Sequence, residues 1–270
     1  MAKIVFFCKK NMLKWSCSPF LHKKKEHFMS QQNIYDNNTF FEGYQKLRKN
    51  QNNANNVFEG PALFSLLPDL KDKTVLDLGC GVGGHCLEFV NGGAKKVVGI
   101  DISKKMLEVA QKENHHQKIT YLNLPMENLS SLNERFDLVV SSLAIHYVKD
   151  FEKLVSDVFN LLNDDGIFVF SQEHPFNTCF SGGERWTKDE EGNKLFANIS
   201  NYSTDGLRES SWFVNGVKKY HRTFSSIVNT LVLKGFVIEK FVEPIPTEQM
   251  LEKYPEHKDL LHKPDFLVVR

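Results

Sequence analysis

A short apolar run that ends in closely spaced glycines constrains this chain more than any other feature. The run lies at residues 75–84 and reads VLDLGCGVGG. Glycine lets a backbone turn sharply and lets a ligand approach without a Cβ in the way, so the pattern is typical of a buried strand that turns into a helix at a ligand site. Gly79, Gly81 and Gly84 also match the GxGxxG spacing of dinucleotide-binding turns, which alone would fit an NAD enzyme.

A regular alternation of strands and helices around this turn predicts an α/β fold. Short apolar runs predict strands at 74–78, 97–100, 119–122, 136–141 and 166–171. Helical patterns separate them at 85–91, 104–114 and 151–162. A helix at 223–234 and two more strands at 236–242 and 266–269 complete the series. This order predicts a Rossmann-like, mostly parallel sheet with right-handed crossovers and helices on both faces.

The segments that flank this core predict one domain, residues 29–270, behind a basic leader. Residues 1–28 contain seven lysines and one acidic residue, and their apolar stretch is too short for a secretory signal. They are a disordered leader, an organellar targeting piece, or sequence upstream of a start at Met29; we favour the first or the third. We expect the domain to comprise a helical cap at 30–70 with a polar linker at 50–56, a cofactor-binding core at 74–175, a substrate-side insertion at 176–220 and a C-terminal part at 221–270.

The composition excludes several classes of protein. A hydrophobic content of 41% and a charged content of 25% suit a globular protein. The net charge of +1 gives no global attraction to nucleic acid or to an anionic membrane, and no apolar run approaches the roughly 20 residues that span a bilayer. The five cysteines lack paired spacing, which predicts reduced thiols in a cytoplasmic protein and no metal cluster. The sequence does not indicate an oligomeric state.

Two acidic residues indicate which ligand the glycine turn takes. Asp77 stands two residues before Gly79, where its carboxylate would repel a pyrophosphate but would attract the ammonium and sulfonium of S-adenosylmethionine. The alternative is an Asp that caps the following turn. Asp101 ends the next strand, 22 positions after Gly79, close to the roughly 20-residue spacing of an acid that binds a ribose diol. Its alternative role is the N-cap of the helix near Lys104, for which Ser103 is an equal candidate.

Four segments together resemble the class I S-adenosylmethionine-dependent methyltransferases, in particular their small-molecule branch known as type 11. The segments are VLDLGCGVGGH (75–85), VVGIDISKKMLEVA (97–110), FDLVVSSLAIHYVKD (136–150) and LLNDDGIFVFSQEHP (161–175). The resemblance implies a seven-stranded sheet whose last strand is antiparallel, with S-adenosylmethionine as the cofactor. It also implies methyl transfer to an O, N or C atom of a small molecule.

The resemblance implies a role for individual residues of the cofactor site. The methionine end of the cofactor would be lined by Asp77, Gly79 and Gly81, and the ribose would bind Asp101. The adenine would pack on Ile102, with its edge facing Met126 and Glu127. The floor of the site would be formed by Ser142 and Leu143. Relatives often carry Asp where this chain has Pro125, which removes both that carboxylate and a backbone donor. An N-terminal helix would close the site, and its Tyr44 would face the substrate. Arg48 of the same helix would bind the methionine carboxylate. The alternative is that Arg48 is a solvated surface side chain.

Candidate groups for binding and activating the acceptor follow the strand ends, where open α/β sheets bind ligands. His146 and Tyr147 follow the fourth strand, and Glu173 and His174 follow the fifth. His174 is the first candidate for a general base and His221 the second, because imidazole titrates near neutral pH. The alternative for His174 is a structural role in the turn before Pro175, because proline restricts the backbone of the preceding residue. The alternative for His221 is an exposed position at the start of a helix. We expect Tyr220 and Arg222, on either side of His221, to contact substrate.

The predicted insertion is dense in aromatic residues, which are either the roof of a pocket or a local cluster that anchors a long loop. They are Phe176, Phe180, Trp186, Tyr202, Trp212 and Phe213. Three alternative functions stay open: a tRNA-modifying or acyl-carrier-linked methyltransferase, a regulatory protein that binds S-adenosylmethionine without catalysis, and an NAD oxidoreductase, which Asp77 disfavours. The fourth strand lacks an Asn-Pro-Pro-Tyr run, and no Pro-Cys dipeptide is present, which argues against amino and cytosine-C5 methylation of nucleic acids.

Overall fold

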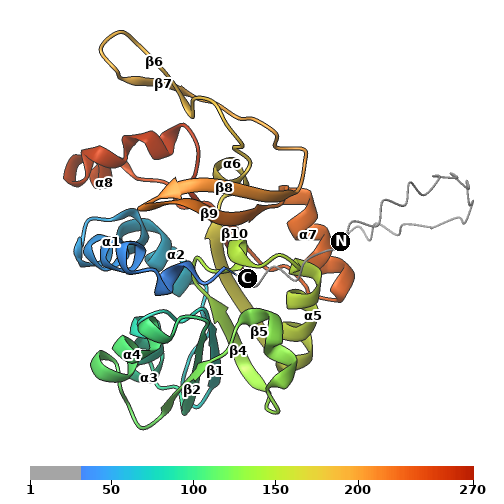
Figure 1. Ribbon diagram of the computed structural model, residues 1–270. Coiled ribbons are helices and arrows are strands. Elements are labelled where there is room, and N and C mark those ends of the chain that lie inside the picture. The colour runs from blue at the N-terminus through green and yellow to red at the C-terminus, as the bar shows by residue number, and fades with distance from the viewer. Residues whose placement is uncertain (1–31) are drawn as a thin grey trace, which may run out of the picture. The chain divides into compact units, whose positions relative to one another are not determined.

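The computed structural model describes residues 32–270, which form one compact unit. The expectations for residues 1–28 lie outside this described part. In the described chain no helix has the length and apolar character needed to cross a membrane. Figure 1 shows a central twisted sheet with helices on both sides.

The sheet has seven strands in the order β10-β11-β5-β4-β1-β2-β3. The strands are β1 Thr74–Leu78, β2 Lys96–Asp101, β3 Ile119–Asn123, β4 Phe136–Ser141, β5 Leu162–Glu173, β10 Phe241–Val242 and β11 Phe266–Val269. Strands β1 to β5 pair in parallel, whereas β11 is antiparallel to both β5 and β10. The predicted Rossmann-like sheet with an antiparallel last strand is therefore confirmed.

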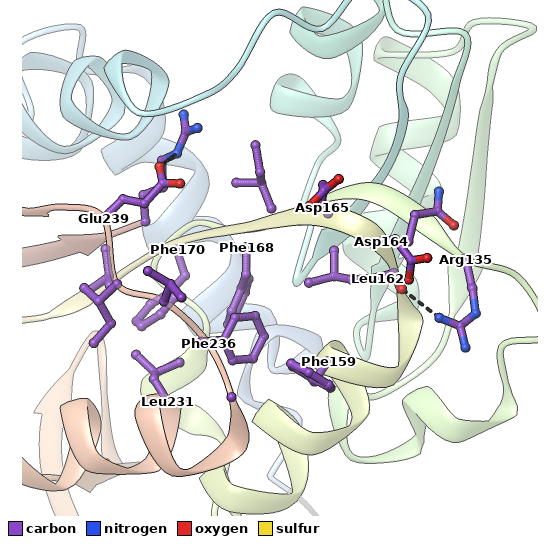
Figure 2. A pocket seen from close by; sticks show the side chains of 18 residues that line it. Arg135, Phe159, Leu162, Asp164, Asp165, Phe168, Phe170, Leu231, Phe236 and Glu239 are labelled. Carbon is purple, nitrogen blue, oxygen red and sulfur yellow. Dashed lines mark hydrogen bonds and ion pairs between the residues drawn. The ribbon is translucent and has the colours of Figure 1, made fainter.

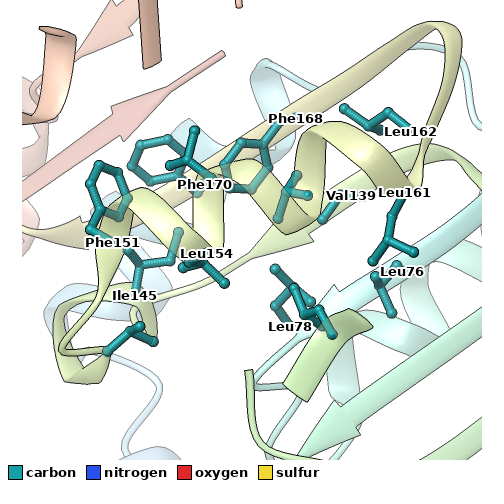
Figure 3. Close-up of a cluster of buried hydrophobic side chains, with 14 of the residues drawn as sticks. Leu76, Leu78, Val139, Ile145, Phe151, Leu154, Leu161, Leu162, Phe168 and Phe170 are labelled. Atoms are coloured by element: carbon teal, nitrogen blue, oxygen red, sulfur yellow. The ribbon is translucent and has the colours of Figure 1, made fainter. Parts of the chain in front are cut away.

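Residues alternate between the two faces of the sheet, and each face has its own core. Leu76 and Leu78 of β1 face the core that α5 (Phe151–Leu161) and α7 (Phe224–Lys234) cover. Figure 3 shows Phe151 and Leu154 of α5 near Phe168 and Phe170 of β5 in this core. Val75 faces the other core, which α3 (Gly84–Asn91) and α2 (Gly60–Ser65) cover. This packing leaves the carboxyl ends of β1, β2, β4 and β5 at one edge of the sheet.

Short helices and two hairpins surround that edge. The remaining helical segments are η1 Ile34–Asp36, α1 Asn38–Lys49, η2 Asn55–Glu59, α4 Lys104–Glu113, η3 Met126–Ser131, η4 Ile145–Tyr147, α6 Pro175–Thr178, α8 Glu248–Lys253 and η5 Pro255–Leu261. The predicted insertion forms two hairpins, β6 Trp186–Lys188 with β7 Lys194–Ala197 and β8 Gly206–Trp212 with β9 Val214–His221. The β8–β9 hairpin lies beyond the end of the sheet, next to α1 and α6 (Figure 1).

The strand predicted at 236–242 is wrong for most of its length, because only Phe241–Val242 form β10. The amides of Glu239 and Lys240 both donate to the Arg270 carbonyl, so the ladder with β11 begins only there. Upstream, Phe236 turns inward onto Phe168, and Val237 stays exposed. The gap beside this segment is a pocket of about 610 Å³ at the amino end of β5 (Figure 2), the end opposite the glycine turn.

Candidate functional site

The glycine turn is held against the ends of β2 and β4. The amides of Gly79 and Cys80 both donate to the Ile100 carbonyl at 2.9 Å. Gly79 has φ +70°, and a Cβ there would lie 2.5 Å from the Ala144 Cβ. Gly81 has φ +54°, and a Cβ there would enter open space. The fold itself therefore requires glycine at Gly79, whereas Gly81 borders open space.

Asp101 links this turn to helix α4. One carboxylate oxygen accepts the Gly81 amide at 2.9 Å, and the other accepts the Ser103 amide at 2.8 Å. Burial raises its pKa to about 6. Ser103 is the N-cap of α4, with its hydroxyl accepting the Met106 amide, so the alternative role of Asp101 as that cap is not the one observed. A carboxylate oxygen has two lone pairs, so Asp101 keeps acceptor capacity for a ribose.

Asp77 is buried beneath α3. Its Oδ2 accepts the Cys86 thiol at 3.3 Å, and among the described residues no backbone amide donates to it, so it does not cap the turn. Burial raises its pKa to about 7. A carboxyl group in this state gains its charge most readily when a cation binds nearby. Asp77 and Asp101 thus fit a ligand that has a positive charge and contains a ribose.

The residues assigned by resemblance surround the same turn. Met126 begins η3, and its Cε lies 3.8 Å from the position of a Cβ added to Gly79. The Glu127 carbonyl accepts Lys153 at 2.8 Å. The Ile102 carbonyl accepts the Asn123 side chain at 2.8 Å. Leu143, at φ +50°, donates its amide to the Ser171 hydroxyl at 3.0 Å, which fixes the floor between β4 and β5.

The N-terminal helices bring Arg48 and a residue that the sequence did not indicate, Glu59, to the turn. Burial lowers the pKa of His85 in α3 to about 4 and raises the pKa of Glu59; the charge of nearby Arg48 adds to the shift of His85 and opposes that of Glu59. Glu59 accepts the hydroxyls of Ser142, at 2.9 Å, and Ser171. It ends the π-helix η2, which replaces part of the linker predicted at 50–56, and π-helical turns are frequent at functional sites.

His174, the first candidate for a general base, is held by hydrogen bonds within the fold. His174 is buried as the N-cap of α6, where Nδ1 accepts the Phe176 amide at 3.1 Å. Nε2 must then carry the proton, which it donates to Glu243 Oε1 at 2.9 Å. Both ring nitrogens are occupied, so no lone pair is free for an acceptor.

His221, the second candidate for a base, is held by hydrogen bonds within the fold in the same way. Its Nε2 donates to the Tyr202 carbonyl at 2.8 Å, so its Nδ1 accepts the Thr178 hydroxyl at 2.9 Å. The ring is fully buried and not at the exposed start of a helix. These bonds tie the β8–β9 hairpin to α6.

The two predicted neighbours of His221 also hold the hairpin in place. Arg222 donates to the Val148 carbonyl, and its guanidinium lies 4.9 Å from the centre of the Phe151 ring, so it anchors the start of α5; its Nη1 is buried without a hydrogen-bond partner in the described chain. Tyr220 is half-buried opposite Leu207 in the hairpin ladder.

His146 and Tyr147 do lie at those ends, together with Glu173 and a residue that the sequence did not indicate, Lys219. Lys219 of β9 forms an ion pair with Glu173 Oε1. His146 is buried, and its Nε2 lies 3.9 Å from the same oxygen. Burial lowers the pKa of His146 to about 4, so the ring is neutral at physiological pH.

Six aromatic rings from three distant segments cover this corner of the site; we call them the aromatic cover. They are Tyr35, Phe40, Tyr44, Tyr147, Trp212 and Phe213. Tyr44 has its ring centre 5.2 Å from that of Tyr35 and 6.2 Å from that of Trp212. Of the aromatic residues predicted as a roof, only Trp212 and Phe213 belong to this cover. Phe176 and Tyr202 pack against each other, and Trp186 packs on His262.

Comparisons with known proteins agree with this geometry. The methyltransferase domain family matches residues 76–170. An uncharacterised protein of Haemophilus influenzae is 41% identical over 88% of this chain and 95% of its own length. The crystal structure of a putative S-adenosylmethionine-dependent methyltransferase from Listeria monocytogenes has a TM-score of 0.72 and 37% identity, covering 78% of this chain and 94% of that one. The corresponding enzyme from Mesorhizobium loti has a TM-score of 0.71 and 38% identity over 78% and 95% of the two chains.

This chain therefore belongs to the class I S-adenosylmethionine-dependent methyltransferases. It is a methyltransferase enzyme, and S-adenosylmethionine is its cofactor. That assignment removes the NAD oxidoreductase left open by the glycine spacing.

Proposed function

We propose that this enzyme methylates a small molecule that binds between the carboxyl ends of β4 and β5 and the aromatic cover. The observation that carries the proposal is the cover itself. Phe40 packs edge-on against Trp212 at 5.3 Å between ring centres, although the two residues come from opposite ends of the chain. A site enclosed by rings and a few polar groups is typical of small-molecule binding.

Bound S-adenosylmethionine supplies a methyl carbon made electrophilic by the sulfonium, and the protein has to bind and orient both partners. We propose that Asp101 binds the ribose hydroxyls, that Asp77 faces the positive charge of the methionine end, and that Arg48 binds the methionine carboxylate. Arg48 makes no hydrogen bond within the described chain, so its donors are available for this role. Positioning alone can supply several kcal/mol of the rate enhancement in a transfer of this kind.

Other acceptors are represented among more distant relatives. A malonyl-[acyl-carrier protein] O-methyltransferase of Hamiltonella defensa is 30% identical over 42% of this chain, and a tRNA U34 carboxymethyltransferase of Cellvibrio japonicus is 37% identical over 28%. These matches span less than half of the chain, so they do not carry the acceptor across. The net charge of +1 argues against a polyanionic partner.

A transfer assay with methyl-labelled S-adenosylmethionine and a cell extract of the source organism tests the proposal. The extract is divided by size into macromolecules and metabolites before the reaction. We expect label in the metabolite fraction. Label only in protein or RNA, or no transfer by an enzyme that binds the cofactor normally, would contradict a small-molecule acceptor.

Replacing Asp101 by alanine should weaken cofactor binding by about 1–3 kcal/mol, or about 5- to 150-fold in Kd, because charged hydrogen bonds to the ribose are lost. Calorimetry with S-adenosylhomocysteine measures this loss. Asp164, an exposed residue at the opposite end of the sheet, provides the control substitution Asp164→Ala, which should leave Kd unchanged. Equal affinities in the wild type and in Asp101→Ala would remove Asp101 from the site.

A further inference from the structure

We infer that the acceptor is a neutral or cationic molecule that presents an O–H or N–H group, and that Glu173 binds this group and takes its proton. The inference rests on the proposed function and names the acceptor class for the same site. Glu173 is the last residue of β5, and its Oε1 pairs with Lys219. Its Oε2 accepts no hydrogen bond within the described chain and is not closed off from solvent, so it is free to accept one from a ligand.

The surroundings of Glu173 keep it charged. Burial favours the neutral acid, but the charge and the hydrogen bond of Lys219 outweigh this effect and hold the pKa of the carboxyl below its ordinary value. Lys219 is itself held in place, because its ammonium lies 5.3 Å from the centre of the Trp212 ring as well as on Glu173. His146 Nδ1 accepts the amide of Glu173 at 3.4 Å and so supports the backbone at the same point.

None of the three histidines predicted on the acceptor side competes with Glu173 for the proton. His174 and His221 use both ring nitrogens in hydrogen bonds within the fold. His146 is buried, and its Nε2 lies 3.9 Å from Glu173 Oε1. Tyr147 lies beside Glu173, and burial keeps the pKa of its hydroxyl well above the ordinary value, so it remains protonated. The carboxylate is therefore the group at this corner that can accept a hydrogen bond at neutral pH.

The charges around the site oppose an anionic acceptor. The bases nearest Glu173 are Lys219, which is paired with it, and Arg185, which donates to the Asn177 carbonyl. Arg222, near His146, donates to the Val148 carbonyl. Each of these bases already has a partner within the described chain. A free carboxylate placed next to Glu173 would meet a like charge with little solvent to screen it. A hydroxyl or amine would meet a hydrogen-bond acceptor instead.

The transfer step balances with these groups. A lone pair on the acceptor O or N forms the new bond to the methyl carbon, and the carbon–sulfur bond breaks with its electron pair passing to sulfur. The proton on the acceptor atom passes to Glu173 Oε2. Lys219 stays on Oε1 throughout and limits the change in charge at the carboxyl group.

The test compares three proteins with labelled S-adenosylmethionine and metabolites that ion exchange has separated into cationic, neutral and anionic pools before the reaction. We expect the wild type to label the cationic or the neutral pool. Glu173→Gln should transfer about 10²- to 10⁴-fold more slowly, the range for loss of a positioned proton acceptor. Glu209→Gln, an exposed change on β8 of the same hairpin region, should match the wild type.

Binding of S-adenosylhomocysteine and thermal unfolding are measured for each variant, so that a misfolded protein is recognised. Glu173→Asp, which keeps the charge on a shorter side chain, should recover part of the rate that Glu173→Gln loses. Label in the anionic pool as a base-labile ester would overturn the acceptor class, and a full rate in Glu173→Gln would overturn the role of Glu173. Absence of label from every metabolite pool with intact cofactor binding would instead overturn the proposed function, and this inference with it.

Discussion

Replacing Gly79 by alanine should destabilise the fold by about 2–5 kcal/mol, whereas the same change at Gly81 should mainly abolish cofactor binding. The Gly79 Cβ would lie 2.5 Å from the Ala144 Cβ, and neither atom can rotate away, so the turn and the end of β4 would have to move apart. The cost combines about 1–2 kcal/mol for a left-handed conformation with about 1–3 kcal/mol for overpacking.

The Gly81 Cβ meets no atom within 4 Å, so only the conformational cost of about 1–2 kcal/mol applies to folding. The new methyl group would lie in the space left for the ligand. Urea unfolding and calorimetry with S-adenosylhomocysteine separate the two effects. A Gly81→Ala protein that binds the cofactor as tightly as the wild type would place the ligand elsewhere.

The affinity for S-adenosylmethionine should rise about 10- to 100-fold between pH 5 and pH 8, because cation binding requires Asp77 to be charged. Burial holds the pKa of Asp77 at about 7 in the protein without cofactor. Below that pH a proton must leave before the carboxylate can interact with the methionine end, and above it the carboxylate is already charged. Binding at pH 6 should therefore release a proton, which calorimetry in two buffers of different ionisation enthalpy detects.

Asp77→Asn provides the matched control, because it cannot ionise and should flatten most of this pH dependence. S-adenosylhomocysteine lacks the sulfonium charge, so its affinity should rise less with pH than that of S-adenosylmethionine. The stability of the cofactor-free protein should follow the opposite sign: the raised pKa of Asp77 contributes stability below its ordinary value of 3.8, and that contribution is lost as the pH rises through about 7. Parallel pH profiles for both ligands in the wild type and Asp77→Asn would contradict the role of Asp77.

The sequence predicted the parts of the fold that depend on local patterns. Strands β1 to β4 begin and end within a residue of the predicted ranges, because short apolar runs bounded by glycines and polar residues leave few alternatives. The strand predicted at 236–242 failed because pairing depends on a partner, and β11 offers one only to Phe241 and Val242. Apolar character alone did not distinguish a strand from a segment that turns inward onto the core.

The acceptor side was predicted less well, because its roles depend on contacts between distant segments. The strand pattern predicted that His174 directly follows a strand, but its bond to Glu243 comes from a residue 69 positions away. Lys219 reaches Glu173 only through the register of the β8–β9 hairpin. Glu59 enters through the packing of η2 against β4 and β5, and no spacing in the sequence signals that contact.

A crystal structure of the complex with S-adenosylhomocysteine tests the central claim most directly, since that claim concerns which groups meet the nucleoside. We expect the ribose hydroxyls to bind the Asp101 carboxylate beside Gly81, with the sulfur on the side of the turn that faces Glu173. A nucleoside bound away from the glycine turn, with Asp101 still bonded only to the amides of Gly81 and Ser103, would contradict it.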